Sequence, residues 1–83
     1  MTIQALKNKL ARAGLDAELI KLWNEHGQPV TGICVNHNYP GYYPTAEALQ
    51  AHETASNAAR KAGYHSEPRG SYTATYIWRR ETP

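Results

Sequence analysis

The sequence contains no phenylalanine, and its one methionine is the first residue. The large ring side chains are therefore two tryptophans and six tyrosines. Each of them carries a polar group that needs water or a hydrogen-bond partner. A small core built from such residues leaves several of them half exposed, and half-exposed Tyr and Trp are typical of contact surfaces. The aromatic composition therefore indicates a binding surface as much as a core.

Cysteine and long apolar runs are also scarce. Cys34 is the single cysteine, which excludes a disulfide within the chain. No apolar run approaches the roughly 18 residues that span a membrane, and the first residues lack the apolar core of a signal peptide. We therefore expect a cytoplasmic protein with no membrane segment. Its 83 residues correspond to one small domain, residues 1–83.

Neither positive nor negative charge is in strong excess. Nine Lys and Arg residues stand against seven Asp and Glu residues, giving a formal charge of +2. The basic residues are spread along the chain. This balance argues against a dedicated nucleic-acid binder, which normally carries a strong basic stripe.

Residues 2–26 have the pattern of a helical segment. Ile3, Leu6 and Leu10 recur at helical spacing. In one interpretation, Gly14 divides the segment into a helix pair, with Asp16 as the N-cap of the second helix. In the alternative, a single helix runs through Gly14. Gly27 ends the segment.

The remaining elements follow in order. Residues 29–37 are rich in β-branched side chains and predict a strand, in which Gly32 marks a close approach by another group. Residues 38–44 form a Tyr/Pro/Gly loop. Residues 45–63 predict a helix capped by Thr45, with an alanine-rich buried face that includes Leu49. Residues 64–70 are expected to be a loop because they contain Pro68 and Gly70, and residues 71–80 predict a second strand.

These elements predict an α+β fold. An N-terminal helix or helix pair is followed by strand–helix–strand, with a small two- or three-stranded sheet packed on the Ala-rich helix. The two strands, joined by a helical crossover, are expected to pair in parallel. Because a two-stranded sheet is thin, we expect residues 42–43 to add a third strand or a homodimer to extend the sheet. We expect no internal repeat.

The residues give little support to catalysis or to metal binding. Cys34 and His37 have Cys-x-x-His spacing, but a structural zinc site usually needs a second ligand pair. In an extended chain these two side chains point to opposite faces. A cysteine between Ile33 and Val35 is typical of an inert buried thiol. We therefore predict a protein that is not an enzyme and needs no cofactor.

Aromatic and basic residues near the chain end suggest one binding chemistry. Single-stranded nucleic acids are bound by aromatic rings next to arginines. The residues concerned are Arg69, Tyr72, Tyr76, Trp78, Arg79 and Arg80. Tyr72, Tyr76 and Trp78 alternate along one face of the predicted strand. The competing interpretation packs this aromatic face beneath the alanine-rich helix, and we favour it because the net charge is small.

The loop within the stretch "NHNYPGYYPT", residues 36–45, suggests protein binding instead. Its prolines and glycine stiffen the chain, so binding costs little conformational entropy. Its tyrosines supply the amphipathic contact area that interface hot spots prefer. The predicted partner-binding residues are Asn38, Tyr39, Tyr42, Tyr43, Arg69, Arg79 and Arg80. Replacing Tyr39 with Ala is expected to weaken partner binding and to leave the melting temperature nearly unchanged.

We therefore expect a non-enzymatic small protein that acts by stoichiometric contact with another protein or protein complex. Accessory proteins of phages and plasmids often have this size and character, and some inhibit a host defence complex by occupying its surface. This is an analogy of size and character and not a motif match. The alternative is a weak, sequence-tolerant nucleic-acid-binding protein.

Overall fold

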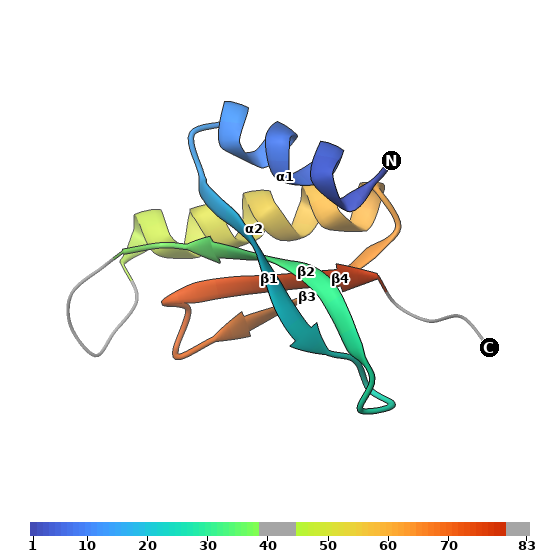
Figure 1. The fold of residues 1–83 in the computed structure, drawn as a ribbon. Coiled ribbons are helices and arrows are strands. Elements are labelled where there is room, and N and C mark those ends of the chain that lie inside the picture. Colours follow the sequence, from blue (N-terminus) through green and yellow to red (C-terminus); the bar gives the residue numbers. More distant parts are fainter. Residues whose placement is uncertain (39–44, 80–83) are drawn as a thin grey trace.

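The chain folds into an α+β structure in which two helices cover one face of an antiparallel sheet (Figure 1). The computed structural model describes residues 1–38 and 45–79. The elements are α1 (Ile3–Arg12), β1 (Asp16–Trp23), β2 (Pro29–Asn36), α2 (Ala46–Lys61), β3 (Tyr64–Arg69) and β4 (Ala74–Arg79). The strand order in the sheet is β1-β2-β4-β3. This arrangement confirms the predicted α+β class and the helix packed on a small sheet.

The described structure contains one unit twice: helix, strand, strand. The second strands of the two units, β2 and β4, lie side by side in the middle of the sheet. Each helix begins at a capping threonine, Thr2 or Thr45, and each is followed by a left-handed glycine, Gly14 or Gly63. The repeat concerns the order of the elements and not the sequence, and the two helices differ in length.

Both predicted helix starts are confirmed by their caps. The Thr2 hydroxyl accepts a hydrogen bond from the Ala5 N–H at 3.0 Å, and the Thr45 hydroxyl accepts one from Ala48 at 3.1 Å. Small residues form the buried face of α2, as predicted: Ala48, Ala55 and Ala59, with Ser56. Leu49 departs from that prediction because 42% of its surface is exposed.

The helix predicted beyond Gly14 is wrong, because residues 16–23 form strand β1. Asp16 is the first strand residue, not an N-cap, and β1 pairs with β2 along its whole length. A tight turn makes this hairpin: the Asn24 carboxamide oxygen accepts from the backbone N–H groups of His26 and Gln28, at 2.9 Å each. Gly27 adopts φ 75° in the turn. Its role is hairpin formation and not helix termination.

The loop predicted at 64–70 is also wrong, since residues 64–69 form the edge strand β3. Pro68 is compatible with an edge position, where a backbone N–H is not required for pairing. β3 reverses the chain between α2 and β4, so β2 and β4 pair antiparallel and not in parallel as expected. The sheet has four strands, more than the two or three predicted. The expected third strand at residues 42–43 lies outside the described residues.

The core lies between the helices and the sheet. Its largest fully buried side chains include Leu6 and Leu10 from α1, Ile33 and Val35 from β2, and Ile77 from β4. All of the strand members belong to one face of the sheet, because Ile33 pairs directly with Ile77 and Val35 with Thr75. The other face of the sheet is covered by neither helix (Figure 1).

Gly32 sets the shape of that other face. A Cβ at this position would stand 2.6 Å from the Ile77 carbonyl oxygen and would also collide with the Leu22 side chain. This confirms the predicted close approach. β2 pairs with β1 over residues 29–36 but with β4 only from Ile33 onward. The β1–β2 hairpin therefore leaves β4 at Gly32 and crosses the other strands at a steep angle (Figure 1).

Candidate functional site on the open sheet face

The sheet face opposite the helices, here called the open face, carries aromatic and charged side chains. Paired residues of antiparallel strands point to the same side. Glu18 pairs with Cys34, Cys34 with Tyr76, and Tyr76 with Glu67, so these four form one row across the sheet. Trp78 pairs with His65 and belongs to the same face. The open face thus carries both rings and carboxylates, with Tyr76 half-buried and Trp78 buried.

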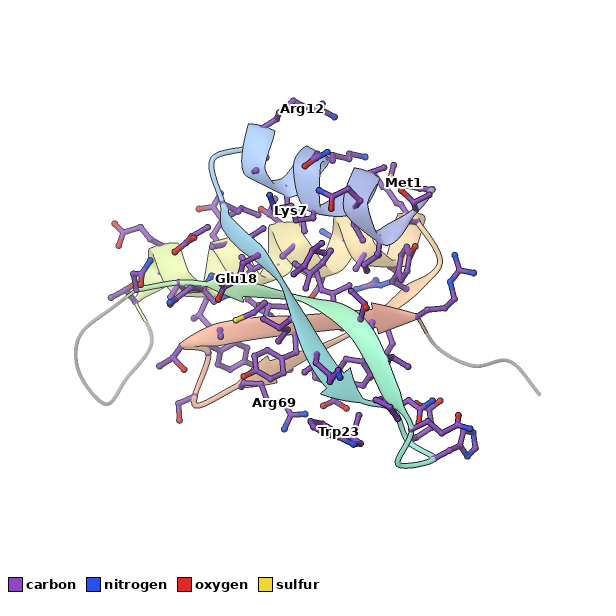
Figure 2. All side chains as sticks on the ribbon, in the orientation of Figure 1. Met1, Lys7, Arg12, Glu18, Trp23 and Arg69 are labelled. Carbon is purple, nitrogen blue, oxygen red and sulfur yellow. The ribbon has the colours of Figure 1, made fainter. Side chains whose placement is uncertain are left out.

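A hollow of about 520 Å³ lies where the β1–β2 hairpin meets the open face. We call it the tryptophan hollow. Trp23, Asn24 and Glu25 line it from the hairpin. His65, Glu67 and Arg69 line it from β3, and Trp78 lines it from β4. Figure 2 shows Trp23 and Arg69 close together on the side of the sheet away from the helices. Both tryptophans of the chain therefore belong to one site.

Charged side chains in the hollow are held by one another and by rings. The Glu67 carboxylate lies 3.2 Å from His65 Nε2 and 3.5 Å from Arg69 Nη2. The Arg69 guanidinium also stacks over the Tyr76 ring at 5.1 Å. The His65 ring meets the Trp78 ring edge-on at 4.7 Å. These contacts fix the orientation of the side chains without a bound partner.

The two tryptophans differ in burial. Trp23 is 63% exposed, whereas Trp78 is 6% exposed. The Trp78 indole N–H is fully covered and has no hydrogen-bond acceptor among residues 1–38 and 45–79. A buried donor without an acceptor is unusual and costs stability. Trp78 therefore forms the floor of the hollow, and Trp23 forms an exposed wall.

The structure divides the six residues predicted to bind nucleic acid. It brings Arg69, Tyr76 and Trp78 together on the open face. Tyr72 lies in the turn before β4 with φ 70°, and its ring contacts His52 of α2 at 5.0 Å. The predicted common face of Tyr72, Tyr76 and Trp78 is therefore wrong. The favoured burial of the Tyr76 and Trp78 face beneath α2 is wrong too, because Thr75 and Ile77 occupy that side.

Arg79 also lies on the helix side of the sheet. Its guanidinium stacks over the Tyr64 ring at 5.5 Å and donates a hydrogen bond to the Tyr64 hydroxyl at 3.4 Å. Arg79 and Arg69 therefore lie on opposite sides of the sheet, and their role in partner binding stays a prediction. Arg80 lies outside the described residues.

Of the predicted loop residues, Asn38 alone is described. It adopts φ 50°, and its side-chain amide donates to the Asp16 carboxylate at 3.2 Å. The asparagine therefore ties the end of β2 to the start of β1. Tyr39, Tyr42 and Tyr43 lie outside the described residues, and their role in binding stays a prediction.

A buried polar network that the sequence did not reveal lies between α2 and the sheet. His37 Nε2 and His52 Nδ1 each lie 2.7 Å from the hydroxyl of the fully buried Thr75. Burial lowers the pKa of His37, and the neighbouring His52 lowers it further. Burial also lowers the pKa of His52, against an opposing effect of Glu53. The network holds α2 on the sheet and connects to no part of the open face described above.

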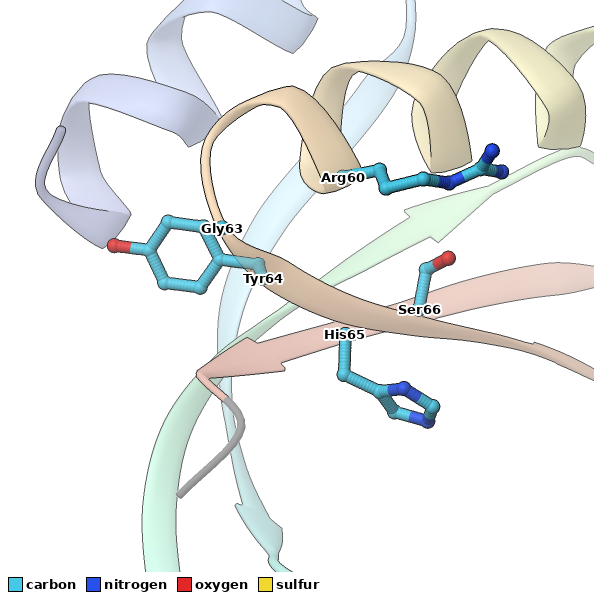
Figure 3. Close-up of a pocket in the computed structure, with 5 residues that line it drawn as sticks. All are labelled: Arg60, Gly63, Tyr64, His65 and Ser66. Atoms are coloured by element: carbon cyan, nitrogen blue, oxygen red, sulfur yellow. The ribbon is translucent and has the colours of Figure 1, made fainter. Parts of the chain in front are cut away.

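A second hollow lies at the end of α2, lined by Arg60 and residues 63–66 (Figure 3). Its side chains point in different directions: Tyr64 toward α1, and His65 away from Arg60 and Ser66. The Tyr64 hydroxyl donates to the Met1 carbonyl at 2.8 Å, and the Ser66 hydroxyl donates to Ser56 at 3.0 Å. The polar groups of this hollow therefore stabilise the fold and do not converge on a ligand.

The Cys34 thiol lies apart from the His37 imidazole. Burial raises the pKa of Cys34, and Glu18 and Asp16 raise it further, so the thiol is a poor nucleophile. Cys34 is on the open face and His37 reaches the helix side, as their spacing indicated. Within residues 1–38 and 45–79, no three His, Cys, Asp or Glu residues are grouped to hold a metal ion.

Sequence reasoning missed Trp23, His65 and Glu67 as site residues. Trp23 was assigned to a helix and the other two to a loop. The signal that could have placed Trp23 is the Asn24-to-Gly27 stretch between two apolar runs, which is typical of a hairpin turn.

Comparison with known proteins adds no relative: no protein-family model matches the chain, and neither curated proteins nor solved structures gave a match. Among the described residues, no helix combines the length and apolar character needed to cross a membrane.

Proposed function

We propose that this protein is a non-enzymatic binding protein that acts by stoichiometric contact with another protein, through the open face of its sheet. One observation carries the proposal: Trp23, which is 63% exposed, and Trp78 line one hollow where the β1–β2 hairpin meets the open face, and Arg69 of the same hollow stacks over Tyr76. Tryptophan and tyrosine are the residues that most often dominate interface energetics. The Arg69 guanidinium over Tyr76 and the His65 ring against Trp78 limit the motion of these two rings, which lowers the entropy lost on binding.

The charges of the open face favour a protein over a nucleic acid. Glu18 and Glu67 lie in the same row as Tyr76, and Asp16 pairs with Asn36 on the same side. Arg69 is already engaged by Glu67 and by the Tyr76 ring. A phosphate backbone approaching Tyr76 would therefore meet more carboxylates than free cations. The nucleic-acid alternative rests on Arg69, Tyr76 and Trp78 alone and is the weaker proposal.

The mode of action would need no cofactor and no chemical step. A small rigid domain that occupies a partner's surface can block it by contact alone, as an inhibitor of a host complex would. The size of the chain and its exposed aromatic face support this subclass. The loop containing Tyr39 would add a second contact if it faces the same partner.

Affinity capture with nuclease treatment tests the proposal. The tagged protein is incubated with lysate of its source organism, with and without nuclease, and captured proteins are quantified. We expect a partner in a near-stoichiometric amount that resists nuclease and is lost with Trp23→Ala. Leu49→Ala is the matched control, because Leu49 is an exposed apolar residue of α2. Recovery that depends on nucleic acid, or equal recovery with Trp23→Ala, would overturn the proposal.

A further inference from the structure

The charges that line the tryptophan hollow indicate which kind of side chain it would bind. Among its described lining residues, the carboxylates of Glu25 and Glu67 outnumber the one guanidinium, Arg69. The exposed Trp23 ring stands in the same wall. An indole face next to carboxylates attracts cations, because the ring quadrupole and the carboxylates both favour positive charge.

The occupant's shape follows from the volume and from the floor. A hollow of about 520 Å³ holds one long side chain and part of the neighbouring backbone. The Trp78 N–H on its floor has no acceptor among the described residues and is covered. The His65 ring lies edge-on to this indole at 4.7 Å. The floor therefore offers ring surface, and the covered Trp78 N–H is not a donor for the occupant.

From this geometry we propose that the tryptophan hollow receives an arginine side chain of the partner protein. Its guanidinium stacks on Trp23 and donates to the Glu67 carboxylate, whose side chain is 44% exposed and which has lone pairs beyond those that His65 and Arg69 engage. Arginine fits better than lysine because a planar guanidinium both stacks on an indole and matches a carboxylate. An acidic side chain would face Glu25 and Glu67 and be repelled. This inference rests on the proposed function, since it names the chemistry of the partner at the same face.

The chain supplies its own reporter for a direct test. Both of its tryptophans line the hollow, so intrinsic fluorescence measures occupancy without a label. The probe is the capped tripeptide Gly-Arg-Gly, compared with Gly-citrulline-Gly, which has the same shape without the charge, and with Gly-Glu-Gly. We expect a saturable fluorescence change with the arginine peptide, roughly tenfold weaker binding of the citrulline peptide, and weaker binding as salt rises.

Two charge-removing substitutions separate the hollow from the rest of the open face. Glu67→Gln should weaken binding of the arginine peptide several-fold, because Gln keeps the shape and loses the charge. Glu18→Gln is the matched control on the same face but outside the hollow, and should leave the affinity unchanged. Equal binding of the citrulline peptide, tighter binding of the glutamate peptide, or no saturable change would overturn the inference.

Failure of this inference is distinguishable from failure of the proposed function. If a partner is captured and Glu67→Gln retains it fully, the arginine inference fails and the proposed function stands. If the arginine peptide binds as described and no protein partner is captured, the hollow is supported and the proposed function fails.

Discussion

At the scale of single residues, Gly32 has the largest structural consequence. Its missing side chain lets the Ile77 carbonyl and the Leu22 side chain approach the backbone of β2. That approach is where the hairpin leaves β4 and turns toward the open face. The sequence indicated a close approach at this glycine, but not what approached it, because the contact joins strands about forty residues apart.

Gly32→Ala should therefore destabilise the protein by about 3 kcal/mol, because the new methyl group collides with a backbone carbonyl that cannot move aside. Gly27→Ala is the matched control: its Cβ meets nothing within 4 Å, and only the left-handed φ of 75° is strained. It should cost about 1 kcal/mol. Chemical denaturation of both variants measures the difference. Equal losses would contradict the assigned role of Gly32.

The His37–Thr75–His52 network predicts a loss of stability in mild acid. The folded-state pKa of both histidines is lowered, mainly by burial, while an unfolded histidine binds its proton near pH 6.5. Below about pH 6.5 the unfolded state therefore binds more protons, and the free energy of unfolding falls as the pH falls. Above that pH this contribution is fully present. Glu53, beside His52, and the Tyr72 ring are the other titratable groups at this pair.

Denaturation curves between pH 7.5 and 5.5 measure this effect. The double variant His37→Gln/His52→Gln should have a flatter profile than the wild type over the histidine range near pH 6.5. His26→Gln, on an exposed turn residue, should keep the wild-type slope. A double variant with the wild-type slope would show that these two histidines do not cause the acid sensitivity.

At the scale of elements, the sequence predicted helices α1 and α2 and strands β2 and β4, but not strands β1 and β3. Helix α1, helix α2 and their caps depend on contacts within a few residues, such as Thr45 with Ala48. Strand β1 reads as an amphipathic helix, because Leu15, Leu19, Leu22 and Trp23 have helical spacing. Its pairing with the β-branched residues of β2 decides the outcome, and that pairing is not visible in a local window. Strand β3 was missed because Pro68 and its polar residues are typical of a loop.

The candidate site depends on these missed elements. Tyr76, Trp78 and Arg69 were recognised as an aromatic and basic group, and the structure brings them together. Tyr72 was grouped with them by alternation and Arg79 by its place near the chain end, but the turn at residues 70–72 and the contact with Tyr64 direct them to the helix side. Trp23 enters the site only because β1 and β2 form a hairpin.

The two tryptophans of the hollow should respond differently to truncation. Trp78→Ala removes a side chain that is 6% exposed and should cost about 3–5 kcal/mol of stability. Trp23→Ala removes an exposed ring and should change stability by about 0.5 kcal/mol or less. Thermal unfolding of the two variants checks this contrast. A large loss with Trp23→Ala would show that this ring supports the hairpin and is not held ready for a partner.

At the scale of the whole molecule, two helix–hairpin units share one sheet. The helices cover one face, and the main core lies between them and that face. The open face carries aromatic and acidic residues, of which Trp78 is buried and the carboxylates are more exposed. This division of the two faces is the physical basis of the proposed function.

The most direct test of the open face is a calorimetric titration of the captured, purified partner against three forms of the protein: wild type, Trp23→Ala and Leu49→Ala. We predict a stoichiometry near one, an affinity loss of at least about thirtyfold with Trp23→Ala, as for an interface hot spot, and no comparable loss with Leu49→Ala. Wild-type affinity in Trp23→Ala, or a loss confined to Leu49→Ala, would contradict the proposal that the open face binds the partner.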